Sequence, residues 1–228
     1  NQNTSNLDLS HGYDVLAGLN LAFGAELRLE NYKITAGDQN SYERFDINGA
    51  PATPTTPANQ VPTDFFGSGR PGGAQVFPGF RPENALSKGR TSGAGYVDVE
   101  LNATKAWLIN AAVRYENYSD FGNTFSYKLA TRIKLMEGLN FRAAVATGFR
   151  APSLQQKYFN STATQFLGGV PFEVGTFTNE SKAANLLGIP NLKQEDSESY
   201  SAGFTYKVPK TSLTFTVDGY FVKIKNRI

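Results

Sequence analysis

LNLAFGAELRLE, residues 19–30, is the stretch that decides the fold, because its side chains alternate between apolar and polar along almost its whole length. In a β-strand, successive side chains point to opposite faces. One face would carry Leu19, Leu21, Phe23, Ala25, Leu27 and Leu29. The other would carry Asn20, Ala22, Gly24, Glu26, Arg28 and Glu30. Strands in soluble proteins average about 5–6 residues, whereas a tilted strand crossing a bilayer needs about 9–11. The length therefore favours a strand between lipid and water.

Six further stretches alternate in the same way. They are residues 96–102, 107–116, 125–135, 139–150, 199–208 and 213–221, of which 96–102 is the shortest, and a partial eighth strand is expected around residues 6–9. A Lys or Arg that faces lipid at mid-bilayer costs roughly 2–4 kcal/mol. The charged residues of these stretches all fall on the polar face: Glu26, Arg28, Glu100, Arg114, Glu116, Lys128, Arg132, Lys134, Arg142 and Asp218. The pattern predicts an all-β fold, an antiparallel up-and-down transmembrane β-barrel segment of about seven to eight strands with a wet interior.

The connections between these strands differ greatly in length. Residues 103–106, 136–138 and 209–212 are short, 117–123 is moderate, and about 31–95 and 151–198 are very long. In bacterial barrels the short turns face the periplasm and the long loops lie outside the cell. Loops beyond about 15 residues are usually functional or disordered, and we interpret these two as functional. The second should hold two short helical turns, over residues 152–158 and 181–188.

Composition excludes several classes of function. A net charge of +2, with basic residues spread through the strands, argues against nucleic-acid binding. Without cysteine there is no thiolate metal site, and the single histidine, His11, is expected in a turn. Carboxylates such as Glu26 and Asp98 are read as packing of a charged barrel wall rather than as a glycosidase pair. We therefore expect no enzyme activity, no catalytic residues, no metal and no cofactor.

A second reading fits the alternation equally well. In a soluble or surface-attached β-sandwich that binds glycans, the apolar face would pack against another sheet. Strand length, the segregation of short from long connections, and aromatic residues near the ends of the apolar stripes, such as Trp107 and Tyr115, favour the membrane instead. An outer-membrane hydrolase would need a nucleophile with a histidine partner, and His11 lies at the wrong rim. The discriminating observation is whether the apolar face contacts protein.

The stretch ATGFRAPSLQQ, residues 146–156, resembles the barrel of TonB-dependent outer-membrane receptors. Similar flanking segments are FGAELRLENYKITAGD (23–38), GAQVFPGFRPENA (73–85), AVRYENYSDFGNTFSYKLATR (112–132) and LKQEDSESYSAGF (192–204). The resemblance implies a barrel of about 22 strands closed by an N-terminal plug domain. It also implies uptake of a bulky nutrient (siderophore-iron, cobalamin or oligosaccharide) across the outer membrane of a Gram-negative bacterium, energised by the TonB complex through the plug.

We accordingly expect residues 1–228 to be a central part of such a barrel, with the plug and the C-terminal strands outside this segment. The expected partners are a small-molecule nutrient and the lipid bilayer, and no nucleic acid. Ligand capture should use the outer loops, and the candidate ligand-binding residues are Phe80, Arg81, Arg150, Tyr158, Phe159 and Phe166. Other loop aromatics that could contribute are Phe65, Phe66, Phe77 and Phe172.

Each of these residues also has a structural interpretation. The aromatics would anchor the loops to one another, and Arg150 would pair with a neighbouring carboxylate or carbonyl. Gly148 is expected on the polar face where a side chain would crowd, and Pro152 is expected to end strand pairing.

Overall fold

The computed structural model describes residues 1–65, 67, 69–73 and 77–228, and strands dominate it. The chain divides into two compact units. We call the first the sheet unit; it comprises Asn1–Glu30, Arg90–Pro152 and Leu192–Ile228. We call the second the loop unit; it comprises Asn31–Gly89 and Ser153–Asn191.

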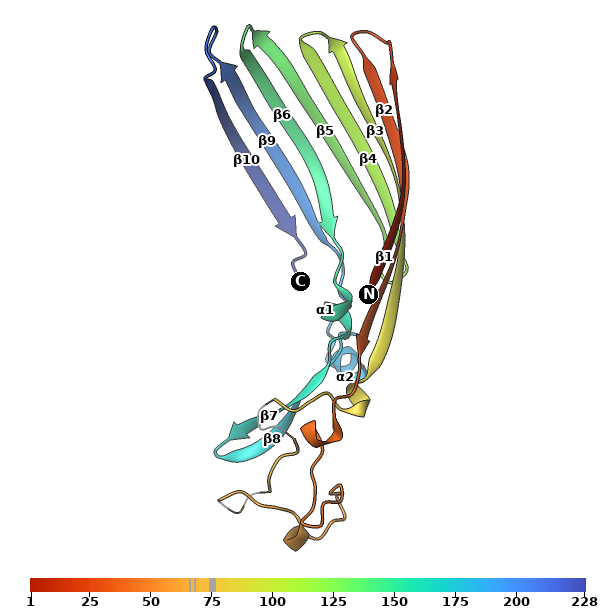
Figure 1. The fold of residues 1–228 in the computed structure, drawn as a ribbon, viewed down its shortest axis with the longest axis vertical. Coiled ribbons are helices and arrows are strands. Elements are labelled where there is room, and N and C mark those ends of the chain that lie inside the picture. The colour runs from red at the N-terminus through yellow and green to blue at the C-terminus, as the bar shows by residue number, and fades with distance from the viewer. Residues whose placement is uncertain (66, 68, 74–76) are drawn as a thin grey trace. The chain divides into compact units, whose positions relative to one another are not determined.

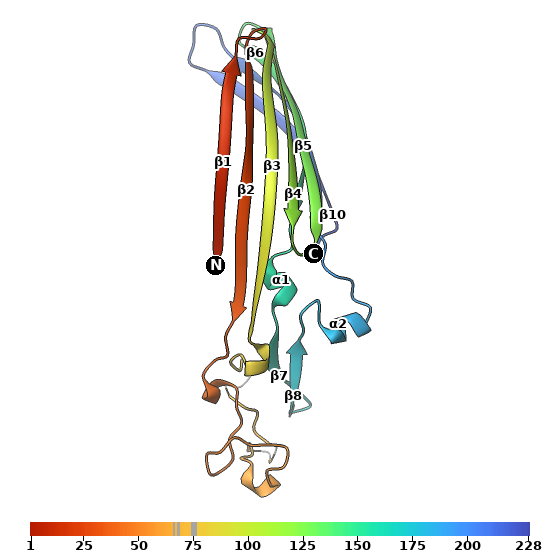
Figure 2. The ribbon, with the colours of Figure 1, turned by 90° about the vertical axis from the view of Figure 1, so that its right-hand side faces the viewer.

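The sheet unit is built on one eight-stranded sheet in the order β1-β2-β3-β4-β5-β6-β9-β10 (Figures 1 and 2). The strands are β1 (Gln2–Tyr13), β2 (Leu19–Ile34), β3 (Leu86–Thr104), β4 (Trp107–Tyr118), β5 (Gly122–Met136), β6 (Leu139–Arg150), β9 (Glu195–Lys207) and β10 (Thr214–Lys225). Neighbours pair antiparallel, for example Leu129 with Val145 and Ala143 with Ala202. The outermost strands, β1 and β10, have one neighbour each, so the barrel is not closed within this chain.

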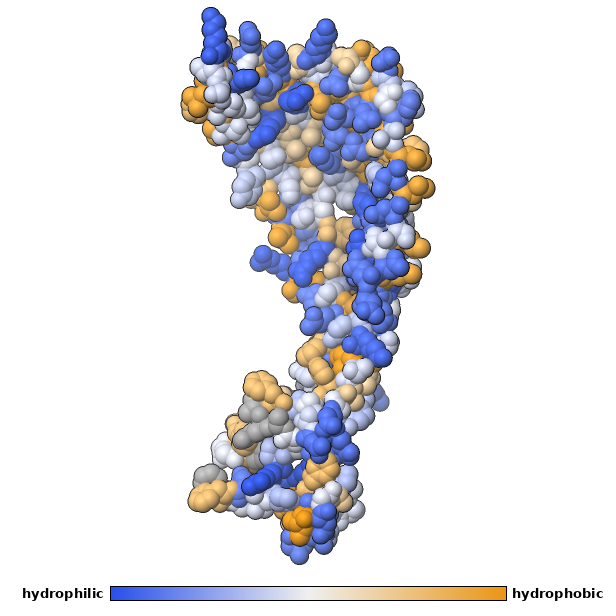
Figure 3. All heavy atoms as spheres, in the orientation of Figure 1, coloured by the Kyte–Doolittle hydropathy of each residue, from blue (hydrophilic) through white to orange (hydrophobic). Residues whose placement is uncertain are grey.

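The apolar face of the sheet is exposed. Leu27 is 50% exposed, Phe125 60% and Val217 71%, and Figure 3 shows apolar residues projecting along one margin of the sheet. In the described part of the sheet unit there is no second sheet to cover this face. A soluble sandwich would bury it, because large contiguous apolar surfaces are rare on soluble monomers. The glycan-binding sandwich is therefore not favoured.

Two glycines let side chains reach across a strand on the polar face. Tyr96 on β3 donates to Asp8 Oδ1 on β1 at 2.6 Å, past Gly24 of β2. Arg142 on β6 pairs with Asp218 on β10, past Gly203 of β9. At either glycine a Cβ would lie 2.5 Å from a backbone oxygen of the next strand. These glycines are therefore required by close packing rather than by a turn.

The structure corrects three expectations about the strands. Residues 6–9 belong to a full strand, β1, which includes His11 paired with Leu21, so the placement of His11 in a turn was wrong. The stretch around residues 96–102 lies in the longest strand, β3, not the shortest. The first ten residues of β3 are rich in Gly and Ser and lack an apolar stripe. Backbone pairing, rather than burial of side chains, therefore extends the strand over these residues. The 117–123 connection shortens to residues 119–121.

The loop unit carries short elements in both long connections. The described part of residues 35–85 contains three 3-10 helices, Gln39–Ser41, Ala58–Gln60 and Pro82–Asn84. The second connection contains α1 (Leu154–Tyr158), β7 (Ser161–Leu167), β8 (Val170–Thr176) and α2 (Lys182–Leu186). Both predicted helical turns are confirmed, although α1 starts from a Ser153 cap, after Pro152.

The β7–β8 hairpin was not expected from the sequence. Gly168 and Gly169, which form its turn, have φ of +60° and +83°. Two consecutive positive φ angles are what the favoured two-residue hairpin turn requires, and glycine adopts them without strain. The Gly-Gly pair, with Phe166 and Leu167 before it and Val170 after it, was the available signal.

Candidate functional site

The loop unit contains an open cavity of about 620 Å³. The first long connection contributes most of the wall, and the β7–β8 hairpin contributes the rest. Its lining includes Phe172, the arginines Arg44, Arg70 and Arg81, and the glutamates Glu43, Glu83 and Glu173. A volume of this size is typical of small-molecule sites, which need a few well-placed polar groups and apolar walls.

Arg81 forms the main ion pair of this wall. Its Nη1 donates to Glu173 Oε2 at 3.0 Å, and its Nη2 donates to the other carboxylate oxygen. The guanidinium hydrogen bonds hold the pKa of Glu173 below its usual range, and Glu173 in turn raises the pKa of Arg81. Asn84 fixes the backbone of Arg81 by accepting from its N–H at 3.0 Å. Both groups are thus ionised at neutral pH and hold the hairpin to the first connection.

Two arginine donors at this cavity lack partners. Arg81 Nε and Arg44 Nε are both buried without a hydrogen-bond acceptor in the described structure. Arg44 lies where Gly69 leaves room, since a Cβ at Gly69 would collide with the guanidinium. Buried polar groups are nearly always hydrogen-bonded, so an unsatisfied pair needs an explanation. An oxygen-rich, anionic ligand would supply the missing acceptors. Sequence reasoning missed Arg44, which has no motif around it.

Of the six candidate ligand residues, only Arg81 lines this cavity. Tyr158 lines a second cavity of about 490 Å³ in the loop unit, with Lys88 and Asn160. Lys88 and Lys157 lie 5.4 and 5.5 Å from the Tyr158 ring centroid. The Tyr158 hydroxyl is 3.4 Å from Glu180. These contacts fix α1 within the loop unit.

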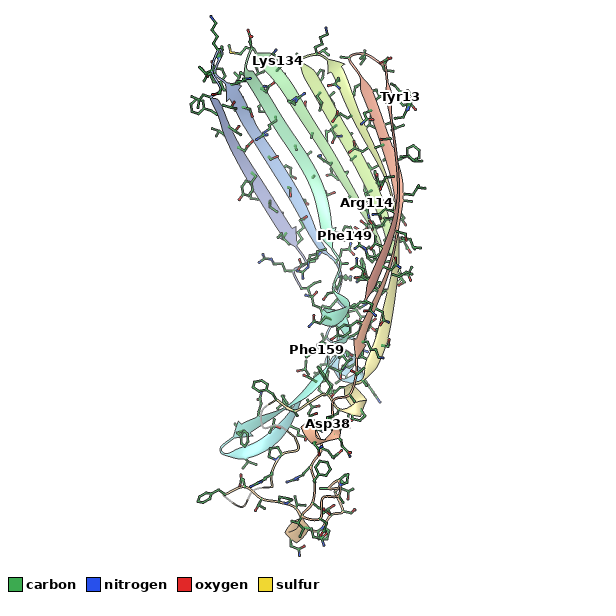
Figure 4. All side chains as sticks on the ribbon, in the orientation of Figure 1. Tyr13, Asp38, Arg114, Lys134, Phe149 and Phe159 are labelled. Carbon is green, nitrogen blue, oxygen red and sulfur yellow. The ribbon has the colours of Figure 1, made fainter. Side chains whose placement is uncertain are left out.

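The remaining candidates lie outside both cavities. Phe159 (Figure 4) packs edge to face against Phe80, with ring centroids 6.1 Å apart, which supports the anchoring interpretation of these two residues. Phe166 on β7 is 42% exposed. The other loop aromatics differ: Phe172 lines the larger cavity, Phe65 and Phe77 are largely exposed, and Phe66 lies outside the described residues.

Arg150 belongs to the sheet unit and is paired with a neighbouring carboxylate. Its Nη1 lies 3.5 Å from Glu195 Oε2, and the two residues face each other across β6 and β9. Nearby, a Cβ at Gly148 would lie 3.0 Å from Ser197 Oγ, as crowding on the polar face requires. The ion pair is the structural role expected for Arg150.

The polar face of the sheet carries a network of charges. Glu26 accepts from Arg28 at 2.6 Å and from Arg114 (Figure 4) at 3.1 Å, and Arg114 also pairs with Glu116 at 2.6 Å. Arg90, only 5% exposed at its side chain, pairs with Glu30 at 2.7 Å. Glu26 is thus neutralised by two arginines, as expected for a charged wall, rather than poised as one of a pair of catalytic acids.

A family model of the β-barrel of TonB-dependent receptors matches residues 1–228. The chain belongs to this family. Proteins of the TonB-dependent receptor family are outer-membrane β-barrels that act as transporters. No helix in the described residues is long and apolar enough to cross a membrane.

Solved structures show the same fold. The siderophore receptor PirA from Acinetobacter baumannii matches with a TM-score of 0.63 and 13% identity, over 99% of this chain and 27% of that chain. A mutant of the ferric enterobactin receptor PfeA from Pseudomonas aeruginosa, in complex with enterobactin, matches at 0.63 and 16%, over 99% and 27%. PirA from Pseudomonas aeruginosa matches at 0.58 and 17%, over 99% and 33%. This chain therefore spans about a quarter to a third of the length of these receptors.

Proposed function

We propose that this chain is the central barrel segment of a receptor that takes up an iron–siderophore complex across the outer membrane of a Gram-negative bacterium. Two observations support the barrel: the family match, and a single sheet whose apolar face is exposed. The cavity with two unsatisfied arginine donors supports an anionic, oxygen-rich ligand, and it is the observation that carries the choice of nutrient.

The wider arrangement is part of the same proposal. The two long connections would lie outside the cell, since the short turns of bacterial barrels face the periplasm. The plug domain, the remaining strands and the contact with the TonB complex would lie in other parts of the receptor. Structural neighbours named for siderophores are consistent with this nutrient class.

Oligosaccharides match the donors of the cavity less well. An oligosaccharide offers hydroxyl groups, which are weaker acceptors for a guanidinium than carboxylate, catecholate or hydroxamate oxygens are. Charge-assisted hydrogen bonds are roughly twice as strong as neutral ones. The arginines at the cavity therefore favour an anionic chelate.

The test is ligand binding by the intact receptor. Ferric catecholate and ferric hydroxamate siderophores, cobalamin and a maltooligosaccharide would be titrated against wild type, Arg44→Gln and, as a control, Lys182→Gln. Lys182 is exposed on α2 and does not line the cavity. A lost hydrogen bond to a charged group costs about 1.5–3 kcal/mol, so Arg44→Gln should weaken siderophore binding about 10- to 100-fold.

Lys182→Gln carries the same charge change and should bind like wild type. Absence of saturable binding for every siderophore would contradict the proposal, and tight binding of the oligosaccharide alone would replace it.

A further inference from the structure

The cavity that we assign to the ligand already contains anions of its own. Three arginines and three glutamates are among its lining residues: Arg44, Arg70, Arg81, Glu43, Glu83 and Glu173. No lysine, histidine or aspartate is among the lining residues that the structure describes, so the formal charges of this wall cancel. A negatively charged ligand therefore meets a net positive wall only if one of the carboxylates moves away.

Glu173 occupies the guanidinium of Arg81 as a ligand anion would. Nη1 of Arg81 donates to one of its carboxylate oxygens at 3.0 Å and Nη2 donates to the other, the paired geometry by which arginine recognises carboxylates and phosphates. Hydrogen bonds from Arg81 and, to a smaller extent, the charge of Arg44 hold the pKa of Glu173 below its usual range. Glu173 thus lies in the field of both arginines whose Nε atoms lack acceptors.

The other two carboxylates at this cavity are held differently. Glu83 lies 4.0 Å from Arg81 Nη1, beyond hydrogen-bond distance, and its side chain is 66% exposed. Glu43 accepts from the backbone N–H of Arg44, the next residue, at 3.3 Å. Both belong to the first long connection, whereas Glu173 belongs to β8 in the second. Of the three carboxylates, Glu173 is therefore the one that can leave the arginines by movement of the element that carries it.

That element, the β7–β8 hairpin, is loosely held. Its two strands pair with each other and with no other strand of the described chain (Figure 1). Every residue of β8 whose side chain the structure describes is exposed, whereas Thr164, which pairs with Glu173 across the hairpin, is buried at the cavity. Segments with few buried contacts open at low free-energy cost. Exchange of the Arg81–Glu173 pair for another anion would therefore break few other contacts of β8.

We propose that Glu173 is an internal competitor for the ligand and sets which ligands the cavity accepts. An anionic oxygen pair of the ligand replaces the Glu173 carboxylate on Arg81, and β8 moves off the arginine. The apparent affinity is then the intrinsic affinity multiplied by the fraction of receptors in which Arg81 is free. A tethered carboxylate has a high effective concentration, and neutral hydroxyl groups do not displace it. This inference rests on the proposed function, because it requires an anionic ligand in this cavity.

The experiment is titration of the intact receptor with a ferric catecholate and a ferric hydroxamate siderophore at pH 7. The test variant, Glu173→Gln, keeps the size of the side chain and removes its charge. It should bind the siderophore about two- to fivefold more tightly than wild type, as expected from the loss of a competing, half-exposed ion pair. The comparison variant, Glu83→Gln, removes the same charge from the same wall. It should tighten binding clearly less, because Glu83 makes no hydrogen bond to Arg81 and is screened by water.

A double-mutant cycle tests whether Glu173 acts through Arg81. Arg81→Gln removes the group for which Glu173 and the ligand compete, so adding Glu173→Gln to it should give no further tightening. General repulsion of the anion by Glu173 would instead tighten binding by the same factor in both backgrounds. Should the Arg81 variants not fold, the comparison of Glu173→Gln with Glu83→Gln still decides the question.

The outcomes separate this inference from the proposed function. If wild type binds a siderophore and Glu173→Gln binds it equally or more weakly, the inference is overturned and the proposed function stands. Tightening of the same size in Glu83→Gln, or in the Arg81→Gln background, would overturn it as well. Absence of saturable siderophore binding in wild type and in every variant would contradict the proposed function, and this inference with it.

Discussion

At the scale of single residues, the most constrained positions on the polar face are glycines that other side chains cross. Gly203 is buried beneath the Arg142–Asp218 ion pair. A Cβ there would collide with the Asp218 carboxylate and would lie 2.5 Å from the backbone oxygen of Val217. The backbone oxygen cannot move without disturbing the ladder of β9 and β10. The ion pair therefore depends on a residue that makes no interaction through a side chain of its own.

We expect Gly203→Ala to destabilise the intact receptor by about 1–3 kcal/mol, the usual cost of overpacking. Gly219→Ala on the next strand is the control, because the nearest atom to its new Cβ is 4.0 Å away. Urea unfolding in lipid vesicles measures both. Equal stability of the two variants would show that the sheet accommodates a methyl group beneath the ion pair.

The Arg81–Glu173 pair gives a prediction about pH. Its hydrogen bonds lower the pKa of Glu173, so the pair stabilises the hairpin fully above the ordinary glutamate pKa of about 4.3. That stabilisation is lost as pH falls through the lowered pKa of the folded state. Glu173 is half exposed, so the pair should contribute only about 0.2–1 kcal/mol.

Resistance of the hairpin to limited proteolysis should therefore be lower in Glu173→Gln than in wild type at pH 7. The difference should shrink as the pH is lowered below about 4.3, with cleavage measured by an acid-active protease. A difference that does not shrink with falling pH would mean that ionisation of Glu173 is not what holds the hairpin.

At the scale of elements, the faces of each strand differ in what they tolerate. Ser201 and Ala202 are adjacent, exposed residues near the middle of β9, and they point to the polar and the apolar face. Ala202→Arg should destabilise the protein by roughly 2–4 kcal/mol, the cost of a lipid-facing arginine at mid-bilayer. Ser201→Arg should be close to neutral. Folding into vesicles followed by urea titration compares them, and equal costs would contradict the assignment of the faces.

The strand periodicity could be predicted because it was repeated and long. Leu19 to Leu29 alternate without a break on the apolar face, and the same logic found six more stretches. The first residues of β1 and β3 escaped prediction because their side chains are polar or small on both faces. Backbone pairing to β2 forms these strands, and a single sequence does not show pairing partners.

The candidate site was less predictable for a physical reason. Arg81 was named as a candidate ligand residue, but its partner Glu173 is 92 residues away in the chain and is brought to it by an unpredicted hairpin. Arg44 gave no signal, since its role comes from the space left by Gly69. Phe80 and Phe159 were named for ligand contact, and the structure shows them packed against each other. Long loops place residues through contacts that local sequence does not encode.

At the scale of the whole molecule, the central claim is that the sheet separates lipid from water. The exposed apolar stripe, the charged face opposite and the family match all support this claim. Residues 1–228 contain no cysteine, so a single cysteine introduced in this segment is its only labelling site.

The most direct test is a spin-label scan of β2 in the intact receptor reconstituted into lipid vesicles. Cysteines would replace Leu21, Ala22, Phe23, Ala25, Glu26 and Leu27 one at a time, omitting Gly24, where a side chain would collide with β1. The accessibility of each label to oxygen and to a water-soluble nickel chelate would be measured. We predict a period of two, with labels at Leu21, Phe23, Ala25 and Leu27 accessible to oxygen and those between them not. If the labels on the apolar face were shielded from both reagents, this face would contact a second layer of protein. That result would contradict its assignment to lipid.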